Sequence, residues 1–419
     1  MTEEMSIQTK EEELEKRNYN RIKELIRLSF TLGVNLTKPT VFKESLKVIN
    51  ICLIVSSIVS IYGHWAKVMK HSGNIPMVGE AICTAFQTLI SVVKMIYFLF
   101  AQRRFQILLA SVQRHEILQK MELFKKDFAV NKKLKLEVDN IMNDAWKDSR
   151  RQIIYYLSAC IGICSNYFFV ALGFNIYHQW KGTPNYIPRF SYPVYYPGWA
   201  ERGFEFPYYH IQMYLTTCAL YISGMCAVTF DGVFIILCVH GVGLINSLKA
   251  IVKHSTSMSI PKEQRVEYLR YCIFHYKRIY QYVLEVNQMF KHISISQFLM
   301  SLVVLGIVLF QMSISVESDR SGLIRMIMYI SAAGYQIIIF CYNGQRLLSA
   351  SEDIPFAFYD CEWYNESEAF KFLVKMSIMR SQHTFQFDIS WFTTMSLATL
   401  MAFVKTCSSY FLLLRNISE

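Results

Sequence analysis

Three ionisable side chains lie inside stretches that are otherwise apolar, and these residues are best placed to do chemistry in this chain. Lys94 and Asp231 fall at similar depth in two such stretches, and Lys405 falls near the end of the chain. A charge inside hydrocarbon is costly, so each must pair or face water. We therefore expect an ion pair between Lys94 and Asp231, either structural or part of a gating element.

Lys405 differs from the other two because polar residues follow it directly, from Thr406 to Ser409. A polar run in a terminal apolar stretch is typical of a helix that faces an aqueous path. The alternative is a polar contact between two helices, since hydroxyl groups also hydrogen-bond across helix interfaces in membranes.

The sequence does not predict an enzyme. It has no His-x-x-x-His, Gly-x-Ser-x-Gly or Cys-x-x-Cys pattern and no glycine-rich phosphate loop. These spacings place nucleophiles, metal ligands or phosphate-binding amides together, and without them the corresponding sites have no support. We expect no catalytic residue, no metal and no cofactor.

Seven apolar stretches are long enough to cross a bilayer, for which a helix needs about 20 residues. With 53% hydrophobic and only 18% charged residues, the 419-residue chain has more apolar surface than a soluble domain can bury. We expect an all-α polytopic membrane protein, with residues 1–419 forming one domain. The expected spans are Val48–Ala66, Gly79–Ala101, Ile153–Tyr177, Ile211–Val239, Ile293–Met312, Leu323–Tyr342 and Phe392–Leu414.

The basic residues between the spans predict the orientation of the chain. One side carries 33 Lys and Arg residues and the other only 7. Because cytoplasmic loops carry the excess of basic residues, the N-terminus is expected in the cytosol and the C-terminus outside. G-protein-coupled receptors have the opposite orientation. The net charge of +11 is thereby assigned to membrane-flanking loops rather than to nucleic-acid binding.

Helical periodicity continues beyond the membrane on the cytosolic side. Residues 1–47 contain an amphipathic segment, Glu11–Phe30, and helices two to six are expected to extend into a cytosolic bundle. A half-apolar helix outside lipid needs a protein partner. We expect residues 241–292 and 343–391 to associate with other subunits, or alternatively to pack within the chain.

The largest extracellular loop, residues 178–209, is rich in aromatic residues and proline. Proline fixes φ and blocks both regular helix and interior strand, so the loop should be stiff and irregular. Such a loop is either a set of interfacial anchors or a lid over an apolar ligand pocket.

Several motifs, in this order and topology, resemble the insect odorant receptor family over nearly the full chain. The motifs are Asp231–His240, Cys272–Tyr276, Val286–Phe290, Ser296–Leu299, Cys341–Gly344, Asp360–Tyr364, Met379–Gln382 and Lys405–Arg415.

The resemblance implies an odorant receptor subunit of the plasma membrane of olfactory sensory neurons. Such subunits form a heterotetrameric cation channel with a shared co-receptor, and a small volatile odorant opens it. The chain lacks the co-receptor's long insertion between spans four and five, so it resembles an odorant-specific subunit. The alternatives are a receptor coupled to a G protein or another non-channel membrane receptor, and a transporter has no supporting internal repeat.

The resemblance also implies functional residues by position. The last helix, residues 392–414, would line the pore, with Lys405 on it. The gate would lie at Leu412 and Leu413, and Arg415 and Asn416 would lie at the pore mouth. The ligand pocket would lie in the outer halves of the spans, although ordinary helix packing explains any single residue equally well. The expected pocket residues are Phe86, Ile90, Tyr167, Val170, Phe174, Tyr209, Met213, Thr217, Ser331 and Tyr335.

Overall fold

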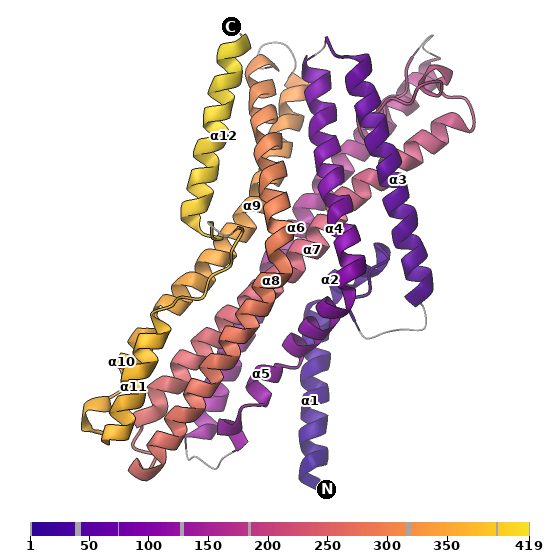
Figure 1. The fold of residues 1–419 in the computed structure, drawn as a ribbon. Coiled ribbons are helices and arrows are strands. Elements are labelled where there is room, and N and C mark those ends of the chain that lie inside the picture. Colours follow the sequence, from indigo (N-terminus) through magenta and orange to yellow (C-terminus); the bar gives the residue numbers. More distant parts are fainter. Residues whose placement is uncertain are drawn as a thin grey trace.

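The computed structural model describes residues 2–37, 43–73, 75–125, 130–182, 186–315, 320–390 and 393–418. Within these ranges every regular element is a helix, and the extended backbone forms only an isolated bridge between Asp388 and Thr394 (Figure 1). The α-helices are α1 (Thr2–Arg21), α2 (Lys23–Thr31), α3 (Lys43–Lys70), α4 (Ile75–Gln113), α5 (Glu116–Gln119), α6 (Asn131–Lys181), α7 (Tyr208–Lys253), α8 (Lys262–Ser315), α9 (Arg320–Glu352), α10 (Ile354–Tyr359), α11 (Glu368–Ser381) and α12 (Leu397–Ser418).

Six of these helices, α3, α4, α6, α7, α8 and α9, are long and apolar enough to cross a membrane. α12 contains a shorter apolar stretch, Leu397–Leu413. The prediction of an all-α, multi-span membrane protein is therefore confirmed. α12 begins at Leu397 rather than at Phe392, which lies outside the described residues. The later start has a local reason, because the Ser396 hydroxyl accepts a hydrogen bond from the Thr399 amide as helix caps do.

The long helices continue well beyond the expected spans, as the periodicity predicted. α6, for example, begins at Asn131, far ahead of Ile153. The expected N-terminal amphipathic helix is divided into α1 and α2, and α2 buries Leu25 and Ile26. Figure 1 shows α1, α5, α10 and α11 at one end of the bundle, which we call the basal end. The C-terminus and the loop of residues 186–207 lie at the opposite, apical end.

α7 forms the centre of the fold. Every residue from Met225 to Ile245 is buried, so helices surround this segment on all sides. Next to it, phenylalanine rings from α4, α7, α8 and α9 pack mostly edge to face, with centroids 4.6 to 5.9 Å apart. This cluster links the four helices through aromatic contacts. Its members are Phe98, Phe105, Phe230, Phe234, Phe290 and Phe340.

Candidate ligand site and pore helix

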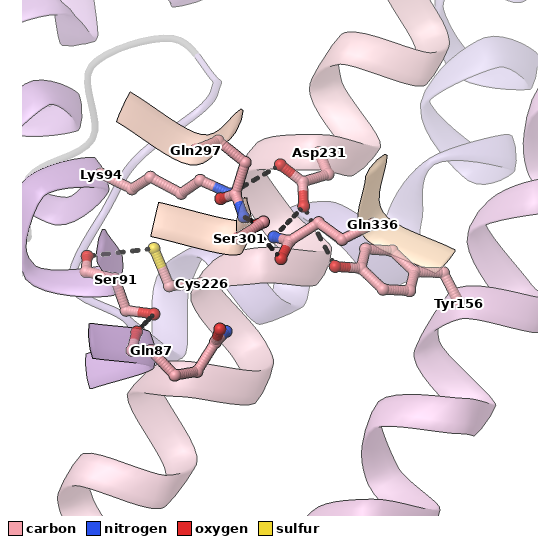
Figure 2. Close-up of polar contacts among 9 residues, drawn as sticks. All are labelled: Gln87, Ser91, Lys94, Tyr156, Cys226, Asp231, Gln297, Ser301 and Gln336. Carbon is pink, nitrogen blue, oxygen red and sulfur yellow. Dashed lines mark hydrogen bonds and ion pairs between the residues drawn. The ribbon is translucent and has the colours of Figure 1, made fainter. Parts of the chain in front are cut away.

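A buried ion pair joins α4 and α7, as the sequence predicted. The Lys94 Nζ atom lies 2.9 Å from Asp231 Oδ1, and the side chains are 1% and 0% exposed. The other carboxylate oxygen of Asp231 accepts hydrogen bonds from the Tyr156 hydroxyl at 3.0 Å and from Gln336 Nε2 at 2.7 Å (Figure 2). Asp231 therefore receives hydrogen bonds from three other helices, which offsets the cost of burying its charge.

The network continues from Gln336 to α8. The Gln297 amide nitrogen donates to the Gln336 carbonyl oxygen and to Ser301 Oγ, both at 2.9 Å (Figure 2). Five helices, α4, α6, α7, α8 and α9, are thus tied to one charge pair. Among the described residues the Gln297 side-chain oxygen is buried without a hydrogen-bond partner, so the network constrains the relative rotation of its helices through its other bonds.

A cavity of about 70 Å³ lies directly beside this network. Tyr156 and Gln336 hydrogen-bond to Asp231 and also line the cavity. These two polar side chains therefore connect the ion pair to the cavity wall. Most of the remaining lining is apolar, as in many small-molecule sites. The lining residues are Gln87, Tyr156, Cys160, Ile163, Cys164, Tyr167, Tyr192, Leu220, Ser223, Gly224, Ala227, Tyr329, Ala332, Ala333 and Gln336.

α6 and α7 approach closely at this cavity. A Cβ atom on Gly224 would lie 2.5 Å from the Cys164 sulfur, which is closer than atoms can pack. Glycine at this position therefore sets the spacing of the two helices and, through it, the shape of the cavity wall.

A second cavity, of about 30 Å³, lies beside the first. Tyr167 and Tyr329 line both cavities. Tyr329 is held in place because its hydroxyl donates to the Cys83 carbonyl at 2.9 Å. The two tyrosines thus belong to the walls of both cavities.

The apical loop covers the larger cavity. Its Tyr192 side chain lines the cavity, and burial raises the pKa of the Tyr192 hydroxyl, which keeps it neutral. The loop is anchored by hydrogen bonds from the Tyr195 amide to the Gly63 carbonyl and between the Arg189 backbone and Asn175. These contacts fit the lid interpretation of the loop, since a set of interfacial anchors would have no reason to bury Tyr192.

α12 exposes its polar residues instead of burying them. Cys407 is buried in a small cluster with Leu305 and Ala333, whereas Lys405 and the run around Ser408 are exposed. Among the residues described, no carboxylate pairs with Lys405. Leu412 and Leu413 are 55% and 54% exposed on the same helix. The side chains of Arg415 and Asn416 lie outside the described residues.

Residues 74–408 match the family model described as 7tm Odorant receptor. The chain is 49% identical to Odorant receptor 63a of Drosophila melanogaster over 411 residues, which is 97% of this chain and 98% of that protein. The chain belongs to the insect odorant receptor family. It is a multi-pass membrane receptor for olfaction and not an enzyme.

This receptor is also 27% identical to Odorant receptor 67b of Drosophila melanogaster, over 93% of the chain and 94% of that protein. Among solved structures, the olfactory receptor OR5 from Machilis hrabei in complex with eugenol superposes with a TM-score of 0.76 at 14% identity. The superposition covers 97% of this chain and 99% of that one, so the fold is shared. The 49% identity to Odorant receptor 63a confirms the expectation of an odorant-specific subunit rather than the co-receptor.

Of the ten expected pocket residues, Tyr167 lines the cavities and the other nine do not. Ile90 is buried, Phe86 packs on the cluster of Cys83, Val304 and Val308, and the Tyr335 ring lies 5.6 Å from that of Tyr156. Thr217 hydrogen-bonds to Ser191 of the loop, Tyr209 accepts a bond from Asn175, and Met213 is half-buried. Val170, Phe174 and Ser331 are exposed. No ligand tests these assignments, and they stay predictions.

Sequence reasoning missed Gln87, Tyr192, Tyr329 and Gln336 as cavity residues of the receptor. For the two glutamines a signal was available, because an amide inside an apolar span must be hydrogen-bonded or face a polar space. For Tyr192 and Tyr329 there was none, since aromatic residues are abundant in the loop and the spans alike.

Proposed function

We propose that this receptor forms an odorant-gated, non-selective cation channel with odorant receptor co-receptor subunits. The assembly is a heterotetramer in the plasma membrane of olfactory sensory neurons. The observation that carries the proposal is the polar face that α12 exposes, with Lys405, Thr406, Ser408 and Ser409 all accessible.

This polar face is hard to reconcile with contact to lipid. The hydroxyls of Thr406, Ser408 and Ser409 bond to carbonyls of their own helix, so they tolerate an apolar environment. The ammonium of Lys405 has no such option and requires water or an anion. A pore between subunits supplies water to this face and leaves the opposite face, with Cys407, packed on the receptor's own bundle.

Apolar residues near the apical end of α12 fit a gate. Leu412 and Leu413 are exposed within one subunit, and rings of leucine from several subunits can close a pore by excluding water. Arg415 and Asn416 follow at the pore mouth, where Arg415 would tune cation permeation in a heteromer.

The orientation is proposed from two features that agree. The 33 basic residues on one side of the predicted spans support a cytosolic N-terminus. The N-terminal helix and the C-terminus lie at opposite ends of the bundle, as an odd number of crossings requires (Figure 1). The basal end is then cytosolic and the apical loop extracellular.

The basal end supports association of subunits. Short helices there expose large apolar side chains, including Phe356 on α10 at 67% and Phe372 on α11 at 61%. Apolar groups exposed together in water mark protein contacts. We assign the tetramer contacts to residues 241–292 and 343–391. The N-terminal helices pack within the chain, α1 against α4 and α2 against α7.

Ligand binding is coupled to the pore through α8. Gln336 at the cavity bonds to Gln297 of α8, and the neighbouring Phe298 ring lies 5.9 Å from the Phe403 ring of α12, edge to face. A ligand opens the channel only if it binds the open state more tightly than the closed one. Through these contacts from the cavity to α12, a ligand bound in the cavity can favour the open state of the pore.

The test is electrical recording from cells that express this chain with the co-receptor, with G-protein signalling blocked. We expect cation currents that volatile ligands evoke in excised patches. Silence across a broad panel of volatiles, with both subunits at the cell surface, would count against the channel. Currents that need an active G protein would favour the alternative receptor class.

A further inference from the structure

Most polar groups that line the larger cavity are already hydrogen-bonded within the protein. The Tyr156 hydroxyl and the Gln336 amide nitrogen donate to Asp231, and the Tyr329 hydroxyl donates to the Cys83 carbonyl. These groups offer a ligand little, because a new bond to them would replace an existing one.

Gln87 on α4 is different. Its backbone carbonyl accepts a bond from Ser91 at 2.9 Å, but its side-chain amide has no hydrogen-bond partner among the described residues. Figure 2 shows this amide without a dashed line, two helical turns along α4 from Lys94. The amide therefore presents both a donor and an acceptor to the cavity.

Ser223 on α7 lines the same cavity and lies beside the Tyr192 hydroxyl, which interacts with it. The Ser223 hydroxyl oxygen is buried and has no partner in good hydrogen-bond geometry among the described residues. A buried polar atom without a partner costs free energy, and a ligand atom that bonds to it recovers part of that cost. Two such groups on two helices face one otherwise largely apolar space.

We infer that Gln87 and Ser223 hold the oxygen atom of a small oxygenated volatile, namely a ketone, aldehyde, ester or alcohol. A carbonyl or hydroxyl oxygen accepts bonds from the Gln87 amide and the Ser223 hydroxyl. The hydrocarbon part of the ligand packs on Ile163, Leu220 and Ala332. These two residues set the preference for oxygenated ligands over hydrocarbons. The inference rests on the proposed function, since activation by the ligand is the readout.

The experiment uses the full chain expressed with the co-receptor, and a ketone, an alcohol and an alkane that share one carbon skeleton. Gln87→Met keeps the length of the side chain and removes its hydrogen-bonding groups. We expect it to raise the half-maximal concentration of the ketone and the alcohol about tenfold, the size of one hydrogen bond lost, and to leave the alkane unchanged. Ser223→Ala should act in the same direction.

Ile163→Val is the matched control, because it trims an apolar wall of the same cavity and should shift all three ligands together. Surface labelling separates poor expression from poor binding, and Ser223→Ala carries the test if Gln87→Met does not reach the surface. If Gln87→Met or Ser223→Ala responds to odorant but keeps the wild-type ratio of ketone to alkane potency, the inference is wrong and the proposed function still stands. A receptor silent to every volatile would overturn the proposed function instead.

Discussion

Lys94 and Lys405 both lie in apolar helices of the same chain, but their surroundings are opposite. Lys94 is 1% exposed and paired with Asp231, which two further side chains also contact. Lys405 is exposed on α12, and no described carboxylate lies beside it. The charge of Lys94 is thus stabilised by an ion pair, whereas the charge of Lys405 is left exposed on the helix surface.

The difference separates a hydrogen-bonded region of the receptor from a region that, on our proposal, is completed by other subunits. Around Lys94, α7 is surrounded by helices and the cavity rests on a bonded network. Around Lys405, the chain alone does not supply the environment that the charge requires. The first region is complete within one subunit, and on our proposal the second is completed when α12 lines water shared with neighbouring subunits.

The largest effect is expected from breaking the buried pair. Lys94→Met leaves the Asp231 carboxylate buried without its counter-ion, which should cost about 3–5 kcal/mol of stability. We expect a lower melting temperature in detergent and little receptor at the surface. Adding Asp231→Asn removes the orphan charge, and the double variant should recover most of the loss. A single variant as stable as wild type would show that the pair is dispensable.

A large functional effect is expected at the proposed gate. Leu413→Ala widens an apolar constriction and should raise the current without odorant several-fold, measured with the co-receptor present. Met401→Ala is the control, because Met401 is also exposed on α12 but lies about three turns from the gate. Basal current equal to wild type would place the gate elsewhere.

A smaller effect is expected where the two regions are linked. Gln297→Leu removes the bond to Gln336 and should shift the balance of open and closed channels about fivefold, lowering the maximal response. Ser301→Ala removes the other bond of the same amide and leaves the link to Gln336 intact. If both variants behave alike, the link through Gln336 is not the route of coupling.

The smallest effect is expected from neutralising Lys405. Lys405→Gln should raise single-channel cation conductance about twofold, since one charge in water changes the energy of an ion about 8 Å away by about 0.5 kcal/mol. Lys70→Gln serves as the control, because Lys70 stacks on the Tyr195 ring of the apical loop rather than facing α12. Equal conductance in wild type and Lys405→Gln would argue against a pore position.

The spans and the Lys94–Asp231 pair could be predicted from sequence because their causes are local. Hydropathy over one helix length identifies a span, and two opposite charges at similar depth have a strong reason to meet. The sequence thus predicts how deep in the membrane a residue lies along its helix.

The sequence does not predict which side of a helix faces the cavity when the helix is apolar on all sides. Val170 and Phe174 were expected at the pocket but lie exposed, while Tyr167, on the same helix, does line the cavity. A span with little polar contrast gives no preferred face, so the pocket depends on packing between helices. Gln336 is different, because an amide inside an apolar span is itself a signal of a polar contact.

The central claim is that the polar face of α12 lines a water-filled pore, and cysteine accessibility tests it most directly. Ser408→Cys places a thiol on the exposed face, next to the native Cys407, which is buried. A membrane-impermeant, positively charged thiol reagent, applied outside during odorant stimulation, should reduce the current of Ser408→Cys and leave wild type unchanged. It should act far more slowly without odorant, when the leucine gate is closed. A conducting Ser408→Cys receptor that reacts no faster than wild type would contradict the account.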